Sequence, residues 1–148
     1  MNQKIFKQYK PRRENKEYIL CKQIAAYLRL KYPKVLFHFD SSGMYHTPVQ
    51  SKQMKAIQHS KGFPDLFIAK ARVIKTGSKF PNDYEVYAGL FIELKAEGTR
   101  LTNCKGNYAT PHIAEQAEVL ERLRDAGYKA EFGIGYDETV KIIDEYLK

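Results

Sequence analysis

Hydrophobic positions along the chain follow two different periods, which predicts a mixed α/β fold. Helical spacing of apolar residues, or a polar run opened by proline, marks four segments, and short continuous apolar runs mark four others. Glycine, proline, asparagine and serine separate these segments, as expected of turns. The predicted helices span residues 14–32, 48–60, 110–126 and 137–147, and the predicted strands span residues 35–39, 66–74, 84–94 and 129–136.

Several residues mark where these elements begin and end. Pro33 ends the first helix, Pro48 lies in the first turn of the polar second helix, and Asp137 is expected to cap the last one. The resulting order, α-β-(α)-β-β-α-β-α, shows neither a repeat nor a linker. We therefore expect residues 1–148 to form one α/β domain in which helices flank a central mixed sheet.

The composition of the chain gives it a net positive charge. Lysine and arginine outnumber aspartate and glutamate by 25 to 17, a net charge of +8, which favours a polyanionic partner. Residues 1–13 carry many of these cations and are predicted to form a basic arm. Lys10, Arg12 and Arg13 would contact phosphates there, although a solvated tail is the alternative.

The apolar runs and the cysteine content argue against a membrane-spanning, secreted or disulfide-rich protein. Apolar runs are too short to cross a membrane, and the basic N-terminus lacks the apolar stretch of a secretory signal. Two cysteines, Cys21 and Cys104, are too few for a disulfide framework or a thiolate metal site. We expect a cytoplasmic protein without a membrane partner.

The candidate chemistry lies at the ends of two predicted strands. Asp65 opens the strand 66–74 and Glu93 nearly ends the strand 84–94. If these strands pair as a hairpin about position 79, the two carboxylates meet at one end of the sheet. Like charges so placed repel each other, and a divalent cation such as Mg²⁺ or Mn²⁺ would relieve that repulsion. Lys95 shares the face of Glu93, while Leu94 points into the core and leaves its carbonyl free.

Each half of this motif is weak when taken alone, because Pro-Asp is a common turn dipeptide and Glu-x-Lys recurs at Glu14. A solvated strand end is then the simpler interpretation. The two halves at opposite ends of a symmetric hairpin favour the metal site.

With these features the chain resembles the PD-(D/E)xK nuclease superfamily and, within it, the VRR-NUC family, especially its small stand-alone phage members. The similarity covers residues 14–148. The segments that carry it are K-E-Y-I-L (16–20), G-F-P-D-L (62–66), F-I-E-L-K (91–95), A-E-Q-A-E-V-L (114–120) and the tail at 123–143.

The resemblance implies a restriction-endonuclease-like core with α-β-β-β-α-β order, one extra helix before the Pro-Asp motif and a C-terminal helix. It also implies a phosphodiesterase that uses Mg²⁺, for which Mn²⁺ can substitute. Asp65, Glu93 and the Leu94 carbonyl would hold the ion, and Lys95 would orient or activate the attacking water.

Two further helical residues match the family less securely. Glu17 would be a catalytic residue and a further candidate metal ligand, with Glu14 as its rival and a plain first-turn acid as the structural alternative. Gln116 would also belong to the catalytic set, in contact with the metal-site lysine or the DNA. The hairpin turn and the segment 95–116 are longer than the family pattern, and Arg100 and Lys105 in that segment could touch DNA or simply face solvent.

The leading hypothesis is a Mg²⁺-dependent DNA endonuclease, acting as a homodimer on branched DNA such as four-way junctions and using no small-molecule cofactor. A phage origin would place it in the cytoplasm of a bacterial host. Within the same class, a nuclease for linear or flap DNA is the alternative. From another class, a non-catalytic DNA-binding module on the same fold is the runner-up.

Overall fold

The computed structural model describes residues 15–41, 46–58, 61–75 and 83–148. The predicted basic arm, with Lys10, Arg12 and Arg13, and the rival acid Glu14 lie outside these residues. The elements in chain order are α1 (Lys16–Lys31), β1 (Leu36–Phe39), α2 (Pro48–Ile57), β2 (Leu66–Ala69), β3 (Arg72–Lys75), β4 (Tyr84–Tyr87), β5 (Leu90–Lys95), α3 (Pro111–Asp125), β6 (Lys129–Ile134) and α4 (Gly135–Leu147).

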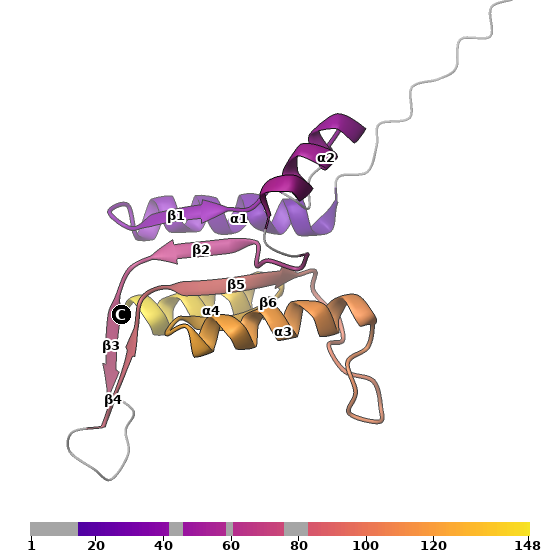
Figure 1. Ribbon diagram of the computed structural model, residues 1–148. Coiled ribbons are helices and arrows are strands. Elements are labelled where there is room, and N and C mark those ends of the chain that lie inside the picture. Colours follow the sequence, from indigo (N-terminus) through magenta and orange to yellow (C-terminus); the bar gives the residue numbers. More distant parts are fainter. Residues whose placement is uncertain (1–14, 42–45, 59–60, 76–82) are drawn as a thin grey trace, which may run out of the picture.

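The main sheet has four strands in the order β1-β2-β5-β6. β1 and β2 are antiparallel, as are β2 and β5, whereas β5 and β6 run parallel and are connected through α3. The sheet is therefore mixed, as predicted. Helices α1, α3 and α4 run along the strands, whereas α2 does not (Figure 1). α1 and α4 pack in one core with the sheet, and α3 packs in another. Among the residues that the structure describes, no helix is both long and apolar enough to cross a membrane.

Successive side chains of the central strands point to opposite faces of the sheet, so they pack in two separate hydrophobic cores. The larger core joins the sheet to α1 and α4, and the smaller one joins it to α3. The larger core comprises Leu20, Ile24, Leu28, Leu66, Ile68, Leu90, Ile92, Leu94, Ile142, Ile143 and Tyr146, and the smaller one comprises Phe91, Leu120 and Ala130. Every residue of β5 is buried, because helices cover both faces of this strand. Alternation then assigns Glu93, two residues after Phe91, to the α3 side.

The predicted hairpin differs from the observed one, because each of its long strands is broken in two. Continuing the β2–β5 pairing would place Arg72 opposite Val86, but Arg72 pairs with Tyr87 instead. One extra residue lies on the first strand, where the Lys70 amide turns back to the Ile68 carbonyl at 3.1 Å. Such a bulge ends a ladder and bends the strand. β3 and β4 consequently form their own two-stranded sheet, which turns away from the main one (Figure 1).

The start of α4 also differs from the prediction that Asp137 caps it. The helix begins at Gly135, directly after β6, and Asp137 lies inside its first turn. Ile134 occupies the cap position and makes no side-chain capping bond. Gly135 adopts a φ of +71°, which glycine tolerates and which turns the chain from strand to helix without a loop.

Candidate active site

Asp65 and Glu93 meet at one end of the main sheet. Leu66 pairs with Ile92 in the β2–β5 ladder, so the next positions outward are Asp65 and Glu93. The predicted juxtaposition of the two carboxylates is therefore confirmed, despite the bulge further along the hairpin. Asp65 is fixed by the backbone, since its Oδ2 accepts a hydrogen bond from the Leu94 amide at 2.9 Å.

Glu93 and Lys95 form a buried ion pair on the same face of β5. Their exposed fractions are 3% and 6%, and Lys95 Nζ donates to Glu93 Oε1 at 3.0 Å. Charged side chains are seldom buried so completely unless they are paired. β5 thus places the carboxyl group of Glu93 and the amine of Lys95 where little solvent reaches them.

Gln116 reaches the same carboxylate from α3. Its Nε2 donates a hydrogen bond to Glu93 Oε1, and the side chain is only 5% exposed. Thr110 caps α3 by accepting from the Ile113 amide at 3.2 Å, which fixes where the helix begins despite the long preceding loop. Gly62 packs against Gln116, because a Cβ at Gly62 would lie 3.3 Å from Gln116 Cγ. The G-F-P-D turn, β5 and α3 therefore converge on Glu93.

Glu17 lies near this cluster without joining it directly. It occupies the first turn of α1 and is half-buried, and its amide donates to the Asn15 side chain at 3.1 Å. Its negative charge contributes to raising the pKa of both Asp65 and Glu93. In the structure Glu17 is thus close enough to act on the acidic pair electrostatically.

The two carboxyl groups hold protons more tightly than free ones. Burial raises the pKa of Asp65 to about 6, against opposing contributions from the Leu94 amide and the Lys95 charge. Burial and then the Asp65 charge raise the pKa of Glu93 to about 8, although Lys95 acts in the opposite direction. A pair of acids with these environments retains a proton near neutral pH unless another cation replaces it.

Unpartnered oxygens in the cluster fit a divalent cation. Within the described part of the chain, Glu93 Oε2 and Gln116 Oε1 are buried and lack a hydrogen-bond partner. Buried acceptors normally have a partner, so the free oxygen of Glu93, whose carboxyl group lies near the Asp65 charge, is suited to a cation. In an extended strand the N–H and C=O of one residue point the same way, so the Leu94 carbonyl faces the Asp65 side with its amide.

The described side chains would not surround an ion by themselves. No group of three histidine, cysteine, aspartate or glutamate side chains among them is placed to hold a metal. Asp65, Glu93 and the Leu94 carbonyl would leave several positions to water and phosphate oxygens. That coordination is typical of Mg²⁺, which usually keeps several waters and uses one or two carboxylates.

Asp40 and Cys21 are two further neighbours of the site that the sequence pattern did not indicate. The Asp40 amide donates to the Asp65 carbonyl at 2.7 Å, and the Asp40 charge contributes to raising the Asp65 pKa. Because β1 pairs with β2, the aspartate that ends the strand 35–39 was the available signal. Burial, followed by the charges of Asp65 and Glu17, raises the pKa of the Cys21 thiol to about 12. Cys21 follows Glu17 by one helical turn, which places a neutral thiol next to the acids.

A pocket of about 550 Å³ lies beside the end of β5. It separates the first turns of α1 from the start of α4 and from the segment that follows Lys95. Its lining residues are Lys16, Ile19, Leu20, Gln23, Ala96, Glu97, Gly98, Gly135 and Tyr136. The pocket is thus adjacent to the site end of the sheet, but neither Asp65, Glu93, Lys95 nor Gln116 lines it.

Arg100 and Lys105 lie in the segment between β5 and α3, and both are exposed. This segment is ordered by a β-bridge between Thr102 and Tyr108 and by Asn103 Oδ1, which accepts from the Lys105 amide at 2.9 Å. Contact of Arg100 and Lys105 with DNA stays a prediction.

Comparison with known proteins agrees with this architecture. No protein-family model matches the sequence, and no curated protein matches it significantly. Among solved structures, the chain is similar to one described as "VRR_NUC domain protein". The match has a TM-score of 0.55 and 24% sequence identity, and it covers 90% of this chain and 88% of the other. The chain thus has the fold of a VRR-NUC domain protein, as the sequence resemblance implied.

Proposed function

We propose that this protein is a metal-dependent endonuclease that hydrolyses phosphodiester bonds in DNA. The observation that carries the proposal is the arrangement around Glu93. One of its oxygens is held by Lys95 and Gln116, and the other is buried and lacks a hydrogen-bond partner among the described residues. Asp65 adjoins Glu93 at the same end of the sheet. The fold shared with a VRR_NUC domain protein and the net charge of +8 support a nucleic-acid substrate.

The site residues fit the chemistry that phosphodiester hydrolysis needs. A divalent ion held by Asp65, Glu93 and the Leu94 carbonyl would supply Lewis-acid charge stabilisation. Lys95, fixed by Glu93 at 3.0 Å, carries a cation that can orient a water molecule and offset negative charge growing on the phosphate. Gln116 and the Leu94 amide hold the two carboxylates in place.

We further propose that the substrate is branched DNA, such as a four-way junction, and that the chain acts as a homodimer with Mg²⁺ or Mn²⁺. The chain carries one such acidic pair in its described part, and paired cuts on a symmetric substrate require two sites. The exposed cations point to phosphate recognition rather than base reading. A purely DNA-binding module is less consistent with an assembled Asp65, Glu93 and Lys95.

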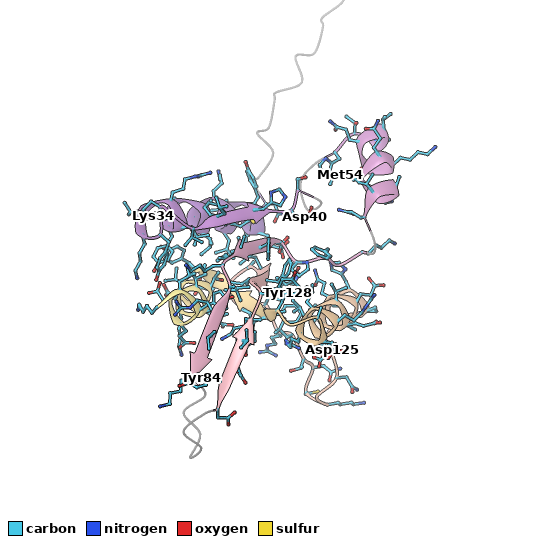
Figure 2. All side chains as sticks on the ribbon, turned by 60° about the vertical axis from the view of Figure 1, so that its left-hand side comes forward. Lys34, Asp40, Met54, Tyr84, Asp125 and Tyr128 are labelled. Carbon is cyan, nitrogen blue, oxygen red and sulfur yellow. The ribbon has the colours of Figure 1, made fainter. Side chains whose placement is uncertain are left out.

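Cleavage of defined DNA substrates tests this proposal. A labelled four-way junction and a matched linear duplex would each be incubated with Mg²⁺ or EDTA, using the wild type and Asp65→Ala. Asp125→Ala is the matched control. Asp125 is an exposed acid at the C-terminal end of α3, whereas Gln116 lies nearer the start of this helix (Figure 2).

The expected result is paired nicks near the branch that require Mg²⁺ and Asp65 but not Asp125. Equal cutting of the linear duplex would keep the nuclease and refute junction selectivity. Tight, salt-sensitive binding without cleavage in Mg²⁺ or Mn²⁺ would overturn the proposed activity and favour the binding module.

A further inference from the structure

One stretch of the sequence stands out by its lack of acids. Asp40 and Asp65 flank 24 residues that contain no aspartate or glutamate and include Lys52, Lys55 and Lys61. The same two aspartates adjoin each other in space at the end of the main sheet. The segment 41–64 therefore starts and ends beside the candidate active site, and its only formally charged side chains are lysines.

The helix in this segment, α2, does not pack into the hydrophobic core. None of its residues is buried, and Val49 and Ile57 are 66% and 84% exposed. A ten-residue helix is marginal in water without packing against other elements. Local contacts start it instead. Thr47 and Gln50 form a reciprocal capping box, and Pro48 lies in the first turn. Figure 1 shows α2 rising away from the sheet and the other helices.

Both ends of α2 are joined to residues around the site. On one side, His46 Nε2 lies 2.6 Å from the Ser41 carbonyl oxygen, directly after Asp40. Figure 2 shows Asp40 near the foot of the helix that carries Met54. On the other side, the chain returns through Gly62, which packs against Gln116. The position of α2 is therefore linked to the acidic cluster.

The lysines of α2 are available for an anionic partner. Lys52 and Lys55 are three residues apart, so they lie on neighbouring turns of one helix face. Both are exposed, as is Lys61. Over the ranges that the structure describes, no carboxylate forms an ion pair with any of the three. Gln50 and Gln53 add further hydrogen-bonding groups without charge.

We propose that α2 is a DNA-backbone clamp, in which Lys52, Lys55 and Lys61 bind phosphates adjacent to the bond that the acidic site cuts. The clamp rests on the proposed nuclease function and adds a binding surface to it. Asp40, Asp65 and Glu93 would repel DNA, and a neighbouring element bearing only positive charge offsets that repulsion. Lysine contacts to phosphate are insensitive to sequence, so the clamp would act on any DNA of suitable shape.

Binding measured against salt concentration tests the clamp. A triple variant, Lys52→Ala with Lys55→Ala and Lys61→Ala, would be compared with a control that loses the same charge elsewhere. The control is Lys34→Ala with Lys75→Ala and Lys141→Ala. These lysines lie after α1, in β3 and in α4, away from α2. Fluorescence anisotropy would follow a labelled four-way junction and a labelled duplex in EDTA, from 50 to 300 mM salt, on the full chain.

The α2 variant should bind at least about tenfold more weakly at about 100 mM salt. Its slope of log K against log salt should shrink by about 2 to 3, since each lost phosphate contact removes about 0.9. The control should shift the slope by less than about 1.

Equal losses in the two triple variants would overturn the clamp, since general charge would then explain them. An unchanged slope in the α2 variant would overturn it as well. So would a change in molar mass by light scattering, because α2 would then contact a second copy of the chain. Failure of the two proposals is distinguishable. Binding that depends on α2 without any cleavage overturns only the nuclease, whereas cleavage with unchanged binding overturns only the clamp.

Discussion

Raising the pH should destabilise the protein when metal is absent, because of Glu93. Its pKa is about 8 in the folded chain and 4.5 when unperturbed. Between these two values the folded state binds more protons than the unfolded state. Each rise in pH therefore favours unfolding. Asp65, with a pKa of about 6 in the fold, adds to this effect only at lower pH.

The size of the effect follows from those two pKa values of Glu93. Between pH 6 and pH 8, the free energy of unfolding should fall by about 2 kcal/mol, since one pKa unit corresponds to about 1.4 kcal/mol. Urea denaturation in EDTA at pH 6, 7 and 8, followed by circular dichroism, would measure it. Glu93→Gln is the matched variant, because it keeps the shape of the side chain but cannot titrate.

Mg²⁺ provides the second half of this test. Metal binding requires a deprotonated carboxylate, so added Mg²⁺ should stabilise the wild type more at pH 8 than at pH 6. Glu93→Gln should show neither the decline with pH nor the pH-dependent gain from Mg²⁺. A wild type whose stability is flat or rises from pH 6 to 8 in EDTA would contradict a raised pKa of Glu93 in the folded chain. So would an equal decline in Glu93→Gln.

Three other predictions address positioning and stability. Lys95→Met should lower kcat for DNA cleavage at least about a hundredfold, with unchanged affinity in EDTA; a comparable loss of binding would contradict a role in the chemical step. Gly62→Ala should lower the free energy of unfolding by about 1 to 2 kcal/mol in urea titrations and also reduce kcat. Gly62 has a φ of +78° and packs on Gln116, so wild-type values for both would refute this role. Asp144→Asn should destabilise the chain by about 1 kcal/mol without altering kcat, because Asp144 of α4 accepts part-buried hydrogen bonds from the Tyr27 and Tyr32 hydroxyls. An unchanged urea midpoint would show that these contacts contribute nothing.

Periodicity predicted most of the elements because each buries one side of a regular backbone. The first helix, for example, was expected over residues 14–32 and is observed as Lys16–Lys31. The errors lie where local geometry depends on tertiary contacts. The bulge after Ile68 divides the hairpin, and Gly135 starts α4 earlier than Asp137. Neither position has a hydrophobic pattern that distinguishes the two outcomes.

The acidic pair was predictable for a geometric reason. Antiparallel pairing places residues symmetrically about a turn, so the midpoint between Asp65 and Glu93 sufficed to bring them together. Side-chain alternation likewise placed Lys95 beside Glu93. Gln116 was singled out through the family resemblance, because a glutamine on a helix carries no pattern that points to a distant strand.

Periodicity and alternation are properties of the local backbone, so the sequence alone indicated most of the helices and strands, the pairing of β2 with β5, and the shared strand face of Glu93 and Lys95. Packing between elements places Asp40 and Cys21 next to the site and leaves α2 outside the core. It also buries Glu93 with one oxygen that has no partner among the described residues. Those features depend on which elements pack together. Which elements pack together depends on burying apolar surface along the whole chain, so no single position in the sequence indicates it.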